Sequence, residues 1–166
     1  MPADPQGPAR ADETGPRRPR VRVVAAALFD GEGRVLIADR PSGKPMSGRW
    51  EFPGGKVAAG ESDARALSRE LAEELGIEVL AAHEAMRLSH DYPDRRVELS
   101  MWVVERYRGE PRGLEGQRLK WVRLPDLDRE DMLEADRPFI EALRSSAPPA
   151  PPACGAGRPD RGPLLQ

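Results

Sequence analysis

The sequence predicts one α/β domain between two tails that lack the composition of a folded core. Three observations support this prediction. Several central segments show the apolar patterns of strands, one central segment repeats its leucines at helical spacing, and both ends are rich in Pro and Gly. We place the domain at 21–144 and the tails at 1–20 and 145–166. Neither tail has enough large apolar side chains to offset the entropy lost on ordering, so we expect both to be disordered.

Charge and composition exclude several classes of protein. The 166 residues include 26 Lys and Arg against 28 Asp and Glu, which is not the basic surface of a nucleic-acid-binding protein. Cys154 is the only cysteine, which fits a reducing, cytoplasmic compartment. No apolar run approaches the roughly 20 residues of a membrane span, and no secretory signal precedes the domain. We therefore expect a cytoplasmic protein, a monomer, that binds neither membranes nor nucleic acid directly.

Four segments of the domain are predicted as strands. Residues 21–30 run apolar, as in a strand buried on both faces, and a turn at 31–33 leads to a second strand at 34–39. Residues 95–107 and 118–124 alternate apolar and polar side chains, as in strands with one buried face. The buried face of the longer segment is formed by Val97, Leu99, Met101 and Val103.

Residues 63–75 are predicted to form a helix. Ser62 is suited to the N-cap, Asp63 to the first turn, and Gly76 to the left-handed position after the last turn. The predicted apolar face consists of Ala64, Leu67, Leu71 and Leu75. Two other segments complete the domain. Residues 41–50 form a loop rich in turn residues, and 128–144 form a closing helical region that is interrupted near Pro138.

Three glutamates form a second stripe on the predicted helix. Glu70, Glu73 and Glu74 are spaced i, i+3, i+4, about a quarter turn from the apolar face. The stripe could be a solvated acidic face, because like charges at i, i+4 cost only about 0.2–0.5 kcal/mol. It could instead bind a divalent cation, since Mg²⁺ binds through a few carboxylates together with substrate phosphates. The spacing of the residues around the stripe decides between these two interpretations.

Gly55 is followed after five residues by Glu61, and seven residues later by RELAEELGI at 69–77. At every fixed position this resembles the Nudix box, G-x5-E-x7-R-E-U-x-E-E-x-G-U, where U is apolar. Seven such identities arise by chance on the order of once in 10⁸ placements, if each residue type makes up about one in 15. The resemblance to Nudix hydrolases of the MutT branch covers about 21–143 and includes the segments RPSGKPMSGRWEFPGGK, DYPDRR and EADRPFIEAL. It implies an α/β/α sandwich with a mixed sheet between helices.

The resemblance also implies a Mg²⁺ site, with Mn²⁺ as an alternative cation. Its ligands would be the Gly54 carbonyl oxygen, Glu70, Glu73, Glu74 and Glu115. Arg69 and Glu61 would hold the liganding glutamates in place. The cation would neutralise phosphate charge, lower the pKa of the attacking water and fix an in-line geometry. Glu115 or Glu70 would act as general base, and the sequence leaves that choice open.

The MutT branch implies hydrolysis of 8-oxo-dGTP to the monophosphate and pyrophosphate. Positions that contact base and sugar in this branch are held here by Arg40, Phe52, Arg95 and Asp136, although Phe52 is equally typical of a core residue. The best-known MutT pattern has asparagine in place of Asp136. An ionised aspartate only accepts hydrogen bonds, and Asp136 could accept from N7–H of 8-oxoguanine, from any guanine, or from the amino group of cytosine.

Two further hypotheses therefore stand beside 8-oxo-dGTP hydrolysis. The first is a Nudix pyrophosphohydrolase that acts on CTP, dCTP or another nucleoside triphosphate, and Asp136 favours it. The second is a binding module that recognises a nucleotide without hydrolysing it. Such modules typically lose glutamates of the box, whereas the box of this chain is intact. Turnover of any triphosphate in the presence of magnesium would exclude the binding module.

Overall fold

The structure is a computed structural model that describes residues 18–146. Most of both predicted tails therefore lies outside the described residues. The elements are β1 (Arg20–Leu28), β2 (Arg34–Asp39), β3 (Trp50–Glu51), β4 (Gly54–Lys56), α1 (Asp63–Leu75), β5 (Glu78–Asp91), β6 (Arg96–Arg108), β7 (Leu119–Arg123), the 3-10 helices η1 (Leu124–Arg129) and η2 (Glu134–Asp136), and α2 (Arg137–Ser145). Within this part of the chain, neither α-helix has the length and hydrophobicity that a membrane crossing requires.

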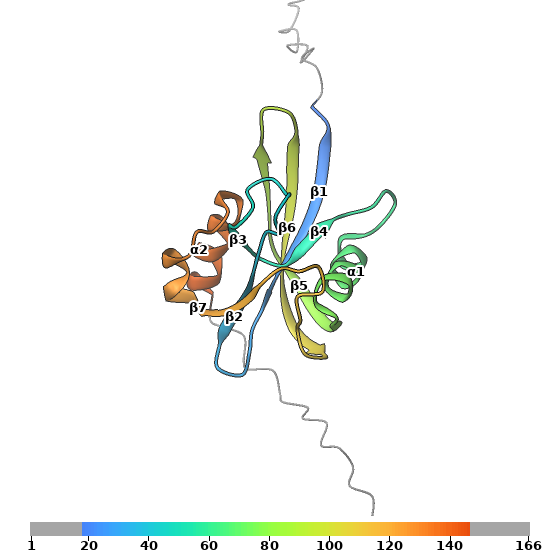
Figure 1. Ribbon diagram of the computed structural model, residues 1–166. Helices are drawn as coiled ribbons and strands as arrows, with labels where there is room; N and C mark the ends of the chain where they lie inside the picture. The colour runs from blue at the N-terminus through green and yellow to red at the C-terminus, as the bar shows by residue number, and fades with distance from the viewer. Residues whose placement is uncertain (1–17, 147–166) are drawn as a thin grey trace, which may run out of the picture.

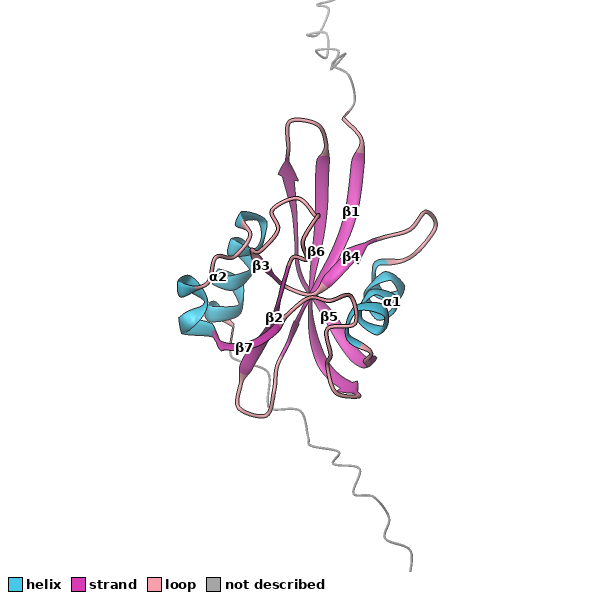
Figure 2. Ribbon diagram, viewed as in Figure 1, coloured by secondary structure: helices cyan, strands magenta, loops and turns pink. Residues whose placement is uncertain are grey.

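The strands form two sheets between the two helices. The larger sheet has the order β4-β1-β6-β5, and the smaller sheet the order β3-β2-β7. The larger sheet is mixed, because β1 pairs with β6 in parallel and the other pairs are antiparallel. Figure 1 shows α1 on one side of the strands and α2 on the other, and Figure 2 shows the strands gathered between them. The predicted α/β sandwich with a mixed sheet is confirmed.

Strand β1 lies at the centre of this arrangement because both of its faces are apolar. Successive side chains of a strand point to opposite faces. Val24, Ala26 and Leu28 belong to the core cluster that contains the leucines of α1, and Ala25, Ala27 and Phe29 belong to the cluster that contains the apolar residues of α2. The continuous apolar run in the sequence is therefore a strand buried between two layers.

Helix α1 has the predicted limits and caps. The Ser62 hydroxyl accepts a hydrogen bond from the Arg65 N–H (3.4 Å), and Gly76 is left-handed with φ 69°. The predicted apolar face is wrong at one position: Ala64 is exposed, and Ala66 is buried with the leucines instead. The reason is that the first turn presents Asp63 to the sheet, where its carboxylate pairs with arginines of β1 and β5.

One other prediction needs correction, and one long strand was not predicted. The closing helical region at 128–144 is broken before Pro138 and not at it: the 3-10 helices η1 and η2 are separated by non-helical residues 130–133, and α2 begins only at Arg137. Pro138 lies in the first turn of α2, where a missing N–H costs nothing. Strand β5 was not predicted at all. It is an edge strand in which no side chain is fully buried, and its pairing with β6 contains register shifts near Ala81 and Met86 that interrupt the alternation along the strand.

Candidate active site

Gly54 and Gly55 allow the helix to approach the sheet closely. A Cβ added to Gly55 would lie 2.2 Å from the carboxyl carbon of Glu70, and a Cβ on Gly54 would lie 2.0 Å from the Val24 carbonyl oxygen. Strand β4 therefore fits between β1 and α1 only if these positions lack side chains. As a result, the Glu70 carboxylate packs directly against the backbone of β4.

Arg69 joins α1 to the loop before it. Its Nε and Nη2 donate to the two oxygens of Glu61 (3.0 and 2.9 Å), and Nη2 also donates to the Lys56 carbonyl oxygen (3.0 Å). Its Nη1 donates to Glu70 (2.8 Å) and to Glu73 (3.3 Å). The hydrogen bonds from Arg69, followed by one from the backbone N–H of Ala58, lower the pKa of Glu61 to about 2. Arg69, paired in this forked way with Glu61, thus also holds the side chain of Glu70.

Glu74 is the most crowded carboxylate of the helix. Its Oε2 accepts from the Gly54 N–H (3.2 Å), and its backbone carbonyl accepts from Gln117 Nε2 (2.9 Å). Burial, and then the nearby charges of Glu115 and Glu70, raise the pKa of Glu74 to about 7, although the bond from Gly54 acts in the opposite direction. A cation placed among these carboxylates would relieve that repulsion.

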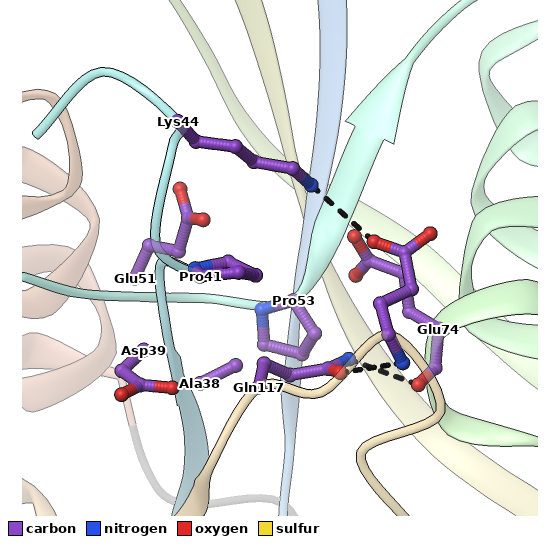
Figure 3. Close-up of a pocket in the computed structure, with 9 residues that line it drawn as sticks. Ala38, Asp39, Pro41, Lys44, Glu51, Pro53, Glu74 and Gln117 are labelled. Atoms are coloured by element: carbon purple, nitrogen blue, oxygen red, sulfur yellow. Dashed lines mark hydrogen bonds and ion pairs between the residues drawn. The ribbon is translucent and has the colours of Figure 1, made fainter. Parts of the chain in front are cut away.

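A pocket opens between α1 and the loop that follows β2. Figure 3 shows Lys44 reaching over this pocket from the loop, and Glu74 facing it from the other side. The polar side chains that line it are Asp39, Lys44, Glu51, Glu74, Glu115 and Gln117. Lys44 Nζ lies 3.3 Å from Glu115 Oε2. The pocket thus brings together two predicted metal ligands from distant parts of the chain.

The predicted ligands fit a divalent cation in chemistry, but the four glutamates among them are each engaged by a protein group. Over residues 18–146, no three His, Cys, Asp or Glu side chains converge closely enough to hold a metal ion as placed. Glu70 is turned to Arg69, Glu74 to the Gly54 N–H and Glu115 to Lys44. All of these donors are hard oxygens, which Mg²⁺ and Mn²⁺ prefer. The residues present therefore suit such an ion in their chemistry.

Two of the predicted substrate residues lie in the interior. Phe52 is 3% exposed and packs edge to face on Phe139, with ring centroids 5.0 Å apart, so its ring is part of the core. Asp136 is 4% exposed, and its Oδ2 accepts from the Phe52 N–H (3.1 Å). Burial raises the pKa of Asp136 to about 7. The structure therefore supports the interpretation of Phe52 as a core residue.

The two predicted arginines lie in different places. Arg40 Nη1 pairs with Glu51 (2.5 Å), and its Nε donates to the Pro45 carbonyl oxygen (2.8 Å). The charges of Arg40 and Glu51 both influence the pKa of Asp136, so these three residues lie close together. Arg95 lies in the turn between β5 and β6, where its partners are Asp94 (3.0 Å) and the ring of Tyr92. The structure therefore does not bring Arg95 to the other three predicted residues.

Sequence reasoning missed Lys44, Glu51 and Gln117 as residues of the pocket. Lys44 and Glu51 come from a loop and a two-residue strand, whose course no periodic pattern encodes. Gln117 lies two residues after Glu115 and accepts from the Glu115 N–H (2.8 Å), while it donates to Glu74. Its nearness to the predicted ligand Glu115 was the one available signal.

The fold and this site define an α/β enzyme with a carboxylate-rich pocket beside a single helix. The NUDIX domain model matches residues 18–143, so the chain belongs to the Nudix family and is a Nudix hydrolase. Hydrolases of this family generally need a divalent metal ion, and a nucleotide substrate is consistent with membership.

Relatives at moderate identity lie in the MutT group. The chain is 34% identical over 125 residues to the 8-oxo-dGTP diphosphatase of Escherichia coli, which covers 75% of this chain and 97% of the relative. It is 43% identical over 122 residues to the putative 8-oxo-dGTP diphosphatase 2 of Mycobacterium tuberculosis (73% and 86% covered). It is also 36% identical over 128 residues to the CTP pyrophosphohydrolase of E. coli (75% and 95% covered). A solved structure of MutT, described for Aliivibrio salmonicida and Vibrio cholerae, superposes with TM-score 0.67 at 35% identity and covers 76% of this chain and 99% of that one.

Proposed function

We propose that this protein hydrolyses 8-oxo-dGTP to the monophosphate and pyrophosphate and so removes an oxidised precursor from the nucleotide pool. The observation that carries the proposal is the arrangement of Glu70 and Glu74 on α1 against the glycines of β4, with Arg69 fixing Glu70. The names of the relatives in E. coli and M. tuberculosis support the choice of 8-oxo-dGTP.

We propose that the cation is Mg²⁺, with Mn²⁺ able to replace it. Its ligands would be the Gly54 carbonyl oxygen, Glu70, Glu73, Glu74 and Glu115. When bound, the ion would neutralise the phosphates, lower the pKa of the attacking water and fix the line of attack. Arg69 and Glu61 would keep the glutamates of the helix in place, because the forked pair holds Arg69 to the loop.

Of the two candidates for general base, the geometry favours Glu115. Glu70 is packed against Gly55 and tied to Arg69, so its carboxylate has little freedom. The Glu115 side chain is 43% exposed, and its one ion pair is to the half-exposed Lys44. Its carboxylate is therefore free to turn toward a water at the pocket and accept a proton from it.

Asp136 would contact the base from the inner end of the site, with Arg40 beside it. Phe52 would contribute its backbone to that end, because its N–H binds Asp136. Arg95 lies apart in the hairpin between β5 and β6, so we leave it out of this contact. A pKa of about 7 gives Asp136 a substantial neutral fraction at neutral pH. A protonated carboxyl group both donates and accepts hydrogen bonds, as the amide of asparagine does. Asp136 would then supply the donor toward O6 that an ionised aspartate lacks. This supports a guanine-type base despite the departure from asparagine.

A substrate panel tests the proposal. Pyrophosphate release should be measured with 8-oxo-dGTP, dGTP and CTP, first for the wild type and then for Asp136→Asn. We expect kcat/KM for 8-oxo-dGTP to exceed that for dGTP by at least about tenfold, since recognition of one extra hydrogen-bond donor is worth about 1–3 kcal/mol. Equal values for the three nucleotides would contradict the choice of substrate while leaving the phosphate chemistry intact.

A cytidine triphosphate is the second candidate. The 36% identity to the E. coli CTP pyrophosphohydrolase favours it, and so does an acidic Asp136, which in its ionised form would accept from the amino group of cytosine. The same panel separates the candidates, because this hypothesis requires CTP or dCTP to give the highest kcat/KM.

We also propose that the protein acts as a monomer in the cytoplasm, where the nucleotide pool is used. The proposed ligands all come from one chain, so the site needs no partner to be complete. Sedimentation equilibrium at micromolar concentration should give the mass of one chain, 18.3 kDa. A dimer mass would contradict this part of the proposal.

A further inference from the structure

Lys44 spans the pocket to one of the proposed metal ligands. It belongs to the loop between β2 and β3, and its ammonium group lies 3.3 Å from Glu115 Oε2. Figure 3 shows its side chain extending from the loop across the mouth of the pocket. Among the residues described as lining this pocket, Lys44 is the one cationic side chain, and it shares the lining with four acidic residues, Asp39, Glu51, Glu74 and Glu115.

The backbone of Glu115 is fixed beside the pocket, because its N–H donates to Gln117 Oε1 (2.8 Å) and Gln117 in turn donates to the Glu74 carbonyl (2.9 Å). The Glu115 carboxylate therefore stays at the pocket when Lys44 moves away. Lys44 is half exposed and reaches Glu115 through a flexible four-carbon stem. Its ammonium group can therefore leave Glu115 without any change in the backbone of the loop.

An ammonium group and a divalent cation cannot share the same carboxylate oxygen at short range, because they repel each other. We propose that Lys44 is a displaceable counter-charge. Its ammonium group holds Glu115 until the divalent cation takes that place, and it then binds the phosphate chain of the incoming triphosphate. This inference rests on the proposed function, since it assigns Glu115 to the cation and Lys44 to the substrate.

Two measurements with opposite expected signs test the inference. In Lys44→Met, Glu115 is freed, so Mn²⁺ should bind the nucleotide-free protein about threefold to tenfold more tightly, as measured by calorimetry or electron paramagnetic resonance. In the same variant, the KM for 8-oxo-dGTP at saturating Mg²⁺ should rise at least about fivefold, because a phosphate contact is lost. Lys44→Arg should return both quantities to within about twofold of the wild type.

Lys120→Met is the matched control. Lys120 is 48% exposed against 51% for Lys44 and also pairs with a carboxylate, Glu130, but it lies on β7 and does not line the pocket. Both quantities should stay at wild-type values in this variant. If Lys44 only stabilised the loop, its replacement would weaken the binding of both Mn²⁺ and the nucleotide.

Unchanged or weaker Mn²⁺ binding by Lys44→Met would overturn the inference, and so would an unchanged KM. Failure of the proposed function gives a different result. Wild-type protein that binds no Mn²⁺ and releases no pyrophosphate from any triphosphate would overturn the proposed function, and the inference with it.

Discussion

Replacing Asp136 with asparagine should change how the stability of this protein depends on pH. Asp136 is 4% exposed, and its Oδ2 accepts from the Phe52 N–H. Burial raises its pKa from 3.8 to about 7; the Phe52 N–H and Arg40 act against this rise, and Glu51 adds to it. The substitution retains an oxygen that can accept from Phe52 and removes the group that titrates.

The sign of the effect follows from where the proton binds more tightly. The folded protein holds the Asp136 proton up to about pH 7, whereas the unfolded chain releases it near pH 3.8. The stabilising contribution of this proton is therefore complete below pH 3.8 and is lost as the pH rises through 7. The interval is about 3 pH units, each worth about 1.4 kcal/mol, so the loss has an upper limit of about 4 kcal/mol.

Urea denaturation of the wild type and of Asp136→Asn, at several values between pH 4 and pH 8, measures this loss. The free energy of unfolding of the variant minus that of the wild type should increase by about 2–4 kcal/mol across the range. Any constant cost of the new amide cancels in this comparison. Asp94→Asn, whose side chain is 68% exposed, serves as control and should show a constant difference. If the difference for Asp136→Asn is also constant, the burial argument is refuted.

Three further substitutions test the helix. Gly55→Ala should lower kcat about tenfold to a hundredfold, because the new methyl group takes the space of the Glu70 carboxylate and forces it out of its place beside Arg69. Wild-type kcat would count against the close approach. Glu74→Gln should lower kcat at least about a thousandfold, because a proposed metal ligand is lost. The free energy of unfolding at pH 8 should stay equal or rise, because the substitution removes a charge from a crowded site. A near-normal kcat would contradict the assignment of Glu74 to the metal site. Arg69→Lys should lower kcat about tenfold, because an ammonium group cannot bind both oxygens of Glu61 and also reach Glu70. If calorimetry gives this variant the same affinity for Mn²⁺ as the wild type, Arg69 does not position the metal ligands.

Helix α1 was predictable because its signals are local. The Ser62 cap, the left-handed Gly76 and three leucines at intervals of four residues lie within 15 residues of one another, and each acts on its own turn of the helix. The buried strand β1 was predictable for a similar reason, since a run of apolar residues needs no partner to be identified. The one error in the helix, Ala64, came from distant arginines that draw Asp63 to the sheet.

The parts that could not be predicted depend on contacts between distant segments. Strand β5 gains its structure from pairing with β6, and its register shifts interrupt the period of two in its sequence. Lys44 and Glu115 are 71 positions apart, and their contact depends on how a turn-rich loop crosses the pocket. The ring of Phe52 faces the core rather than the site because Phe139 of α2 packs against it.

The contacts divide the site into a fixed side and an adjustable side. Helix α1 is held by backbone groups or forked arginine pairs along its whole length: at Asp63 by two arginines, at Arg69 by Glu61 and a carbonyl of β4, and at the Glu74 carbonyl by Gln117 and the Leu114 N–H. The opposite wall depends on ion pairs of Lys44 with Glu115 and of Arg40 with Glu51, and Arg40 also donates to the Pro45 carbonyl oxygen. The more exposed of these pairs, Lys44 with Glu115, is weak and exchanges readily. The rigid wall therefore suits the phosphate chemistry, which needs fixed ligands, and the adjustable wall suits recognition of the nucleotide, whose arrival must exchange one set of ion pairs for another.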